Sequence, residues 1–179
     1  QQAAEEALDA VIERSEPLSA SAAVVDVRTG EVLAIANRPT TNANDSMNRD
    51  VHAFINHAAV DAHEPGSVLK PLVMALAVED GLIHSNSYVD CENGKWRLGG
   101  RIINDDHPHK VVTASEVIKY SSNIGIAKQA LELGPDRVIR GLESFGFSEK
   151  TGLYLPAEVS GKLRQPDKIR PIELATTSY

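Results

Sequence analysis

The stretch Glu64-Pro65-Gly66-Ser67-Val68-Leu69-Lys70-Pro71 carries the most information about the fold. A proline–glycine pair interrupts any preceding element, and the pattern then predicts a helix over 67–80. Pro71 fits the first turn of this helix, where its missing N–H does no harm, and Gly81 follows the last periodic residue. The apolar side chains at helical spacing predict its buried face: Val68, Leu72, Ala75 and Leu76.

Within this stretch, Ser67 and Lys70 stand three residues apart. On a helix this spacing puts both side chains on one face, so the amine can reach the hydroxyl. A serine nucleophile needs a base, and a lysine can serve when burial and nearby positive potential, such as a helix N-terminus, lower its pKa. The alternative is a capping serine beside a solvated lysine, because Ser-x-x-Lys also occurs by chance in many proteins.

A second polar motif, Ser121-Ser122-Asn123, stands in the string Tyr120 to Gly125. Thr113 and Glu116 form a capping-box pattern that predicts a helix ending near this motif. Taken alone, the motif is also explained as a helix-capping serine and asparagine pair.

The rest of the chain predicts short helices around antiparallel hairpins, which indicates an α+β fold. Helices are expected at 1–14, 124–133, 136–145 and from 172 onward, with weak helical character over 50–62. A hairpin is expected at 20–37, with strands 22–27 and 31–36, and a second hairpin within 88–104. Loops are expected at 38–48 and 152–171.

Composition excludes some classes of function. The net charge of −7 argues against nucleic-acid binding, which usually needs a basic face. No stretch reaches the roughly 18 to 20 apolar residues of a membrane span. The single cysteine, Cys91, stands between Asp90 and Glu92, and neighbouring acids raise a thiol's pKa, so we interpret it as structural.

The run Asp105-Asp106-His107-Pro108-His109 contains residue types that bind metals. No matching His or Cys group elsewhere completes a coordination shell, and clustered polar residues in loops are more often only solvated. The sequence therefore predicts no metal and no cofactor.

Both polar motifs and their flanks resemble those of class B penicillin-binding proteins. The similarity continues through Val24 to Pro39, Phe145 to Gly152, Leu155 to Glu158, Gly161 to Leu163 and Ala175 to Tyr179. It is closer to the division and elongation transpeptidases than to the β-lactamases. The resemblance implies an incomplete transpeptidase fold of the penicillin-binding protein and serine β-lactamase type, with helices around part of an antiparallel sheet.

The resemblance also implies a function: a D,D-transpeptidase that cross-links peptidoglycan stem peptides and is acylated by β-lactams. By the same resemblance, Ser67 is the nucleophile, Lys70 the base and Ser121 a proton relay, while Asn123 hydrogen-bonds Lys70 and the substrate. Gly66 and Ser122 are expected to bind substrate.

The family's partners and location follow as further expectations. These are stem peptides, β-lactam antibiotics, division or elongation proteins, and an extracytoplasmic location with an N-terminal transmembrane anchor in the parent protein. Two alternatives stay open: a β-lactam sensor or β-lactamase relative, and a non-catalytic module of a division complex. The sequence has no glutamate in a clear deacylating motif, which argues against the β-lactamase.

A Lys-Thr-Gly sequence, the family's third motif, occurs at 150–152 but without a strand pattern around it. We interpret this match as coincidental and expect the true motif on a strand beyond Tyr179. Residues 1–179 are then a partial transpeptidase domain that lacks its C-terminal strands, which argues against activity of these residues alone. A sheet lacking strands also has an edge available for self-association.

Overall fold

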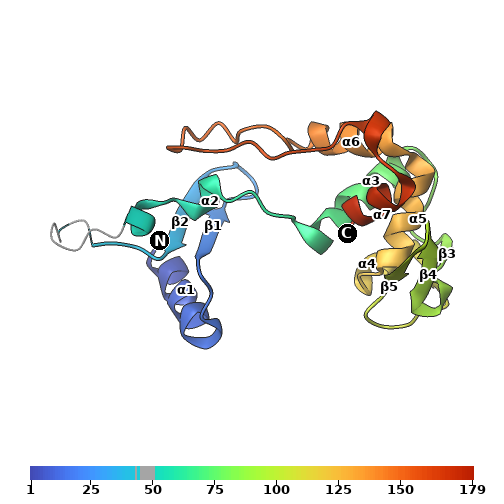
Figure 1. Ribbon diagram of the computed structural model, residues 1–179, viewed down its shortest axis with the longest axis horizontal. Coiled ribbons are helices and arrows are strands. Elements are labelled where there is room, and N and C mark those ends of the chain that lie inside the picture. Colours follow the sequence, from blue (N-terminus) through green and yellow to red (C-terminus); the bar gives the residue numbers. More distant parts are fainter. Residues whose placement is uncertain (43, 45–50) are drawn as a thin grey trace. The chain divides into compact units, whose positions relative to one another are not determined.

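The computed structural model describes residues 1–42, 44 and 51–179 (Figure 1). Contacts divide the chain into two compact units. The first unit contains Gln1–Ala62 and Lys150–Val159, and the second contains His63–Glu149 and Ser160–Tyr179. Helices and short antiparallel strands occur in both units, so the predicted α+β class is confirmed.

In the first unit, helix α1 (Gln2–Ser15) packs on a hairpin of β1 (Ala20–Val25) and β2 (Val32–Arg38). The strands are antiparallel, and Ala22 lies opposite Ala36. Buried alanines on β2 and the buried Leu8 of α1 let the helix approach the sheet. The predicted helix and hairpin are confirmed, with strand limits shifted by about two residues.

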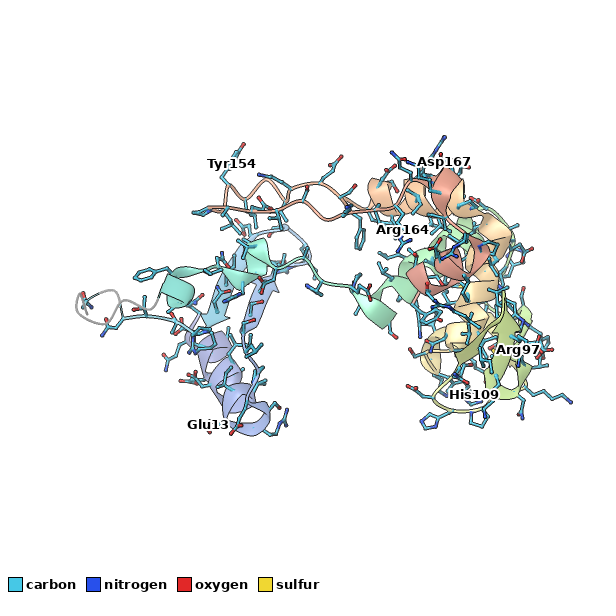
Figure 2. The ribbon with its side chains drawn as sticks, viewed as in Figure 1. Glu13, Arg97, His109, Tyr154, Arg164 and Asp167 are labelled. Carbon is cyan, nitrogen blue, oxygen red and sulfur yellow. The ribbon has the colours of Figure 1, made fainter. Side chains whose placement is uncertain are left out.

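The remaining elements of the first unit are short. A 3₁₀ turn, η1 (Val51–Phe54), and α2 (His57–Val60) fall within the segment of weak helical character. The expected loop at 38–48 lies partly outside the described residues. Segment 150–159 has no regular structure, and Tyr154 projects from it into solvent (Figure 2).

The second unit is mainly helical (Figure 1). Its helices are α3 (Lys70–Glu79), α4 (Ala114–Lys119), α5 (Asn123–Leu133), α6 (Pro135–Ser144) and α7 (Pro171–Thr177). Its strands are β3 (Tyr88–Asp90), β4 (Lys95–Leu98), β5 (Arg101–Asn104) and β6 (Val111–Thr113). Short 3₁₀ turns are η2 (Gly66–Leu69), η3 (Glu92–Gly94) and η4 (Pro166–Lys168).

Strand pairs in this unit are short antiparallel ladders. β4 and β5 form the predicted hairpin, and β3 pairs with β6. Among the described residues, the strands form three two-stranded sheets, so no continuous sheet is present there.

Helix α5 is the centre of the second unit's core. It contacts α3, α4, α6 and α7, and its Ile124, Ile126, Ala127 and Ala130 are fully buried. Side chains with no access to water gain the most from transfer out of water, so this helix is held firmly in place. The residue that begins it, Asn123, is therefore held in place as well.

The start of the helix predicted over 67–80 differs from expectation. Gly66–Leu69 forms a 3₁₀ turn, and the α-helix begins at Lys70. Val68 is 71% exposed and Ala75 is also exposed, so their prediction as buried residues is wrong. The tighter first turn rotates the buried face to residues such as Leu69, Val73 and Ala77.

Candidate active site

Ser67 lies in the 3₁₀ turn η2 and is exposed to solvent. The residue before it, Gly66, has a φ of 65°, a left-handed conformation that glycine adopts without steric cost. Gly66 thus lets the chain turn sharply into η2 and present the Ser67 hydroxyl at the surface.

Lys70, three residues later, is only 2% exposed. Its ammonium donates three hydrogen bonds, to the Ser121 carbonyl oxygen (2.6 Å), to Ser121 Oγ (2.9 Å) and to Asn123 Oδ1 (2.6 Å). Burial lowers the pKa of Lys70, and the negative charges of Asp105 and Asp106 partly offset this effect. Lys70 is therefore a buried amine with all three of its donors in use.

The turn between α4 and α5 brings the second motif to Lys70. The capping box predicted for Thr113 and Glu116 is present at the start of α4. Ser121 follows α4 with a φ of 54°, which is uncommon for a residue other than glycine. The Ser121 hydroxyl donates to Ser67 Oγ at 3.3 Å, so the two sequence motifs meet through this contact.

Asn123 is fixed by contacts from both sides of its amide. Its oxygen accepts from Lys70, and its Nδ2 donates to the Asn104 carbonyl oxygen at 2.8 Å. Because the amide has a donor partner on one side and an acceptor partner on the other, its orientation follows from the network.

Ser122, which was expected to bind substrate, has a buried side chain at the start of α5. It is 1% exposed, caps α5 by accepting from the Gly125 N–H at 2.9 Å, and donates to Asp105 Oδ2 at 2.7 Å. A side chain enclosed in this way has no surface for a substrate. The burial therefore does not support Ser122 as a substrate-binding residue; its side chain faces inward, where it caps α5 and donates to Asp105.

Two residues near the site were not among the sequence candidates for catalysis. Asp105 contacts Ser122 and the Ile124 N–H, and the Tyr179 ring centroid lies 5.8 Å from Lys70 Nζ. Asp105 appeared in the sequence only as part of a candidate metal cluster. Its spacing from the motifs carries no signal for this role, since it approaches them through the β5–β6 connection.

The candidate metal cluster does not converge on a shared point. No group of three or more His, Cys, Asp or Glu side chains suited to a metal occurs among the residues that the structure describes. Asp105 accepts from the Ile124 N–H at the start of α5. His109, in the loop that joins β5 to β6 and labelled in Figure 2, stacks on the Tyr120 ring with centroids 4.3 Å apart.

Cys91 is fully buried in the core, where desolvation raises the pKa of its thiol. A thiol with a raised pKa is a poor nucleophile at neutral pH. The burial fits the structural role expected for this residue.

The Lys150-Thr151-Gly152 sequence does not lie on a strand. Both the N–H and the hydroxyl of Thr151 donate to Glu158 Oε1, at 2.7 and 2.6 Å, which closes a local loop in the first unit. The absence of a strand at these residues fits our interpretation that the match is coincidental.

Comparison with known proteins identifies the class. A family model described as "Penicillin binding protein transpeptidase domain" matches residues 20–179. The chain belongs to this family.

Two curated relatives are named as peptidoglycan D,D-transpeptidases, one of them as probable. The chain is 36% identical over 161 residues to the peptidoglycan D,D-transpeptidase FtsI of Escherichia coli K12, covering 90% of this chain and 27% of the relative. It is 30% identical over 174 residues to the probable peptidoglycan D,D-transpeptidase PenA of Neisseria gonorrhoeae, covering 97% and 30%. The chain therefore spans less than a third of the length of these relatives.

Solved structures agree on the fold. A peptidoglycan glycosyltransferase from Burkholderia ambifaria superposes with a TM-score of 0.88 at 35% identity, covering 100% of this chain and 52% of that one. The transpeptidase domain of penicillin-binding protein 3 from Burkholderia pseudomallei gives a TM-score of 0.84 at 32% identity, covering 96% and 47%. The predicted penicillin-binding protein fold is confirmed.

Proposed function

We propose that the whole protein is a peptidoglycan D,D-transpeptidase that works through a serine acyl-enzyme on Ser67. The observation that carries this proposal is the hydrogen-bonded chain from Ser67 through Ser121 to the buried Lys70. Nucleophilic catalysis by serine needs a general base linked to the hydroxyl, and a buried amine connected by hydrogen bonds can supply it. Membership of the transpeptidase family supports the same reaction.

The route of the proton follows from the partners of Lys70. A neutral amine has two N–H donors and one lone pair, so one of the three contacts must reverse when the ammonium loses a proton. The Ser121 carbonyl oxygen and Asn123 Oδ1 can only accept. Since the Ser121 hydroxyl can also donate, we infer that it passes its proton to Lys70 while accepting the proton of Ser67.

The reaction then proceeds in two acyl transfers. Ser67 Oγ attacks the carbonyl between two terminal D-alanines; the C–O bond forms, the peptide C–N bond breaks, and the relay returns the proton to the departing amine. An amine of a neighbouring stem peptide next attacks the ester; a C–N bond forms and Ser67 leaves with a proton. A β-lactam carbonyl would be opened by the first step and retained as an ester.

Substrate, partners and location follow from the same reaction. The substrate is the stem peptide of peptidoglycan, which lies outside the cytoplasmic membrane, so we propose an extracytoplasmic location. We propose division or elongation proteins as partners, and β-lactams are the expected inhibitors because the chain belongs to the penicillin-binding protein family. Among residues 1–42, 44 and 51–179, no helix is long and apolar enough to cross a membrane.

The test is acylation by a fluorescent penicillin, followed by intact mass in the whole protein. We expect a stable adduct that is absent from Ser67→Ala and present in Ser85→Ala, which changes an exposed serine of the same unit. An adduct that hydrolyses within seconds would indicate a β-lactamase instead. A wild-type protein that forms no adduct would contradict the proposed nucleophile and favour a non-catalytic module.

A further inference from the structure

Beside the residues proposed to react, the carboxylate of Asp105 binds two groups at the start of α5, one on its N-cap and one in its first turn. Asp105 Oδ2 accepts from Ser122 Oγ at 2.7 Å, and Oδ1 accepts from the Ile124 N–H at 3.0 Å. Both oxygens therefore bind the turn, one through a side chain and one through the backbone. Hydrogen bonds to an ionised carboxylate are stronger than those between neutral groups.

Asp105 is itself fixed from the opposite side. Its N–H donates to the Gly94 carbonyl oxygen at 3.1 Å, which ties it to η3. A Cβ at Gly94 would lie 2.8 Å from the Pro108 Cα, so only glycine permits this close approach of the two backbones. The neighbouring Asn104 carbonyl accepts from Asn123. Asn104, the last residue of β5, and Asp105, which follows it, thus hold the residues around the start of α5 by hydrogen bonds.

We propose that Asp105 is a positioning residue, which fixes the Ser121-Ser122-Asn123 turn through Ser122 and Ile124 and places a negative charge near Lys70. This inference rests on the proposed function, because the turn matters for catalysis only if Lys70 and Ser121 transfer a proton. Asp105 touches none of the reacting atoms, and its effect passes through the turn and through its charge.

The hydrogen bonds of Asp105 and its negative charge can be tested separately, because other residues near Lys70 have only one of these two effects. Asp106 also raises the pKa of Lys70 by its charge, but it is exposed and makes no hydrogen bond to the turn among the described residues. Ser122 binds Asp105 but carries no charge. Asp106→Asn therefore changes the charge alone. Ser122→Ala removes the contact with Asp105, together with the N-cap of α5, but leaves the charge unchanged. Asp105→Asn changes both the charge and the contact.

Among the described residues, the charged and titratable groups near Lys70 are the carboxylates of Asp105 and Asp106 and the phenol of Tyr179. Burial and the charge of Asp105 raise the pKa of Tyr179. We therefore expect this phenol to stay neutral in the pH range in which Lys70 loses its proton. Removing either carboxylate lowers the pKa of Lys70. The pH at which Lys70 becomes a base should fall accordingly.

The experiment measures the rate of acylation by a fluorescent penicillin against pH in the whole protein. For Asp106→Asn we expect the rising limb of the pH–rate profile, which we assign to ionisation of Lys70, to move to lower pH with the maximal rate unchanged. For Ser122→Ala we expect an unmoved limb and a maximal rate lower by about tenfold or more. Asp105→Asn should show both changes. Equal profiles for Asp105→Asn and Asp106→Asn would overturn the positioning role.

A second readout does not depend on activity. Amide hydrogen exchange at Ile124 should be faster in Asp105→Ala than in the wild type, because its N–H then loses its acceptor. An unchanged rate in a folded Asp105→Ala protein would overturn the inference. If the wild type is not acylated, the proposed function fails, and the exchange rate still decides whether Asp105 fixes the turn. Should Asp105→Ala not fold, exchange is measured in Asp105→Asn, where a neutral and weaker acceptor should speed exchange at Ile124 and an unchanged rate overturns the inference.

Discussion

The hydroxyl oxygen of Ser121 lies 3.3 Å from that of Ser67, and this contact joins two segments more than fifty residues apart in sequence. Lys70, although three residues from Ser67, directs its ammonium to Ser121 and Asn123. The amine and the proposed nucleophile are thus connected through a third residue. The predictions below test this relay and the structure that supports it.

Removing the middle of the relay should slow acylation while leaving Ser67 in place. We expect Ser121→Ala to lower the rate of acylation by a penicillin by roughly 10²- to 10⁴-fold, the range of general acid–base catalysis. Stopped-flow fluorescence measures this rate. Ser115→Ala, an exposed serine on α4, is the matched control. A rate in Ser121→Ala equal to that of the control would show that the proton takes another route.

Lys70 should act as a base and not only as a charge. Burial lowers the pKa of Lys70 below its ordinary value of about 10.4, so acylation should rise with pH below that value. Arginine keeps its proton throughout this range. Lys70→Arg should therefore lose roughly 10²- to 10⁴-fold in rate together with the pH-dependent limb.

The exposed Lys119 provides the control for that substitution, and Lys119→Arg should keep the wild-type profile. If Lys70→Arg retained the rise of the acylation rate with pH, the ionisation behind that rise would belong to a group other than Lys70.

Gly125 should tolerate no larger residue, because it lies against the core behind the turn. A Cβ at this position would meet both Val117 methyl groups at 2.7 Å and Ser122 Oγ at 3.2 Å. We expect Gly125→Ala to reduce the free energy of unfolding by about 1–3 kcal/mol. Urea unfolding measures the change. In a Val117→Ala background the cost should shrink, since the clashing methyl groups are gone; strict additivity would refute the packing argument.

Lys150 should be dispensable for acylation. It belongs to a loop in the first unit that is held by Thr151 and Glu158, not to a strand. Lys150→Ala should leave the acylation rate and the stability close to wild type, with the change in stability within about 0.5 kcal/mol. Thr151→Val, by contrast, should destabilise the protein by about 1 kcal/mol through the lost hydroxyl contact. A large loss of acylation in Lys150→Ala would show that our interpretation of this motif is wrong.

The stability of α7 should depend on the ionisation of Glu173. Hydrogen bonds from Arg170 lower the pKa of Glu173 to about 2 in the folded protein. The unfolded value is about 4.3, so between these pH values the unfolded chain binds more protons and stability rises with pH. The stabilisation from Glu173 is complete above about pH 4.3 and is lost as pH falls through about 2.

Thermal melts of Glu173→Gln and the wild type should therefore differ at pH 7 and converge near pH 2. Glu149→Gln, which changes an exposed glutamate of the same unit, is the control. A difference that did not depend on pH would show that the contribution of Glu173 is not electrostatic.

The local signals of the sequence were enough to define most elements and both polar motifs. Three features are set by neighbouring residues and can be predicted without tertiary contacts. They are the capping box at Thr113 and Glu116, the turn between β1 and β2, and the glycine–proline pair that begins α6. Ser67, Lys70, Ser121 and Asn123 were candidates because their residue types and order resemble a known family.

Other features depend on contacts between residues distant in sequence, and only the tertiary structure decided them. Helical period alone predicted the burial of Leu76 correctly but wrongly placed Val68 and Ala75 in the buried face, because residues 66–69 form a 3₁₀ turn before α3. Ser122 faces inward, where its hydroxyl donates to Asp105, the residue that follows β5. Lys70 contacts Ser121 because α5 packs on α3. A chain encodes its local geometry in adjacent residues, but the energy of burial depends on surfaces that meet only after folding.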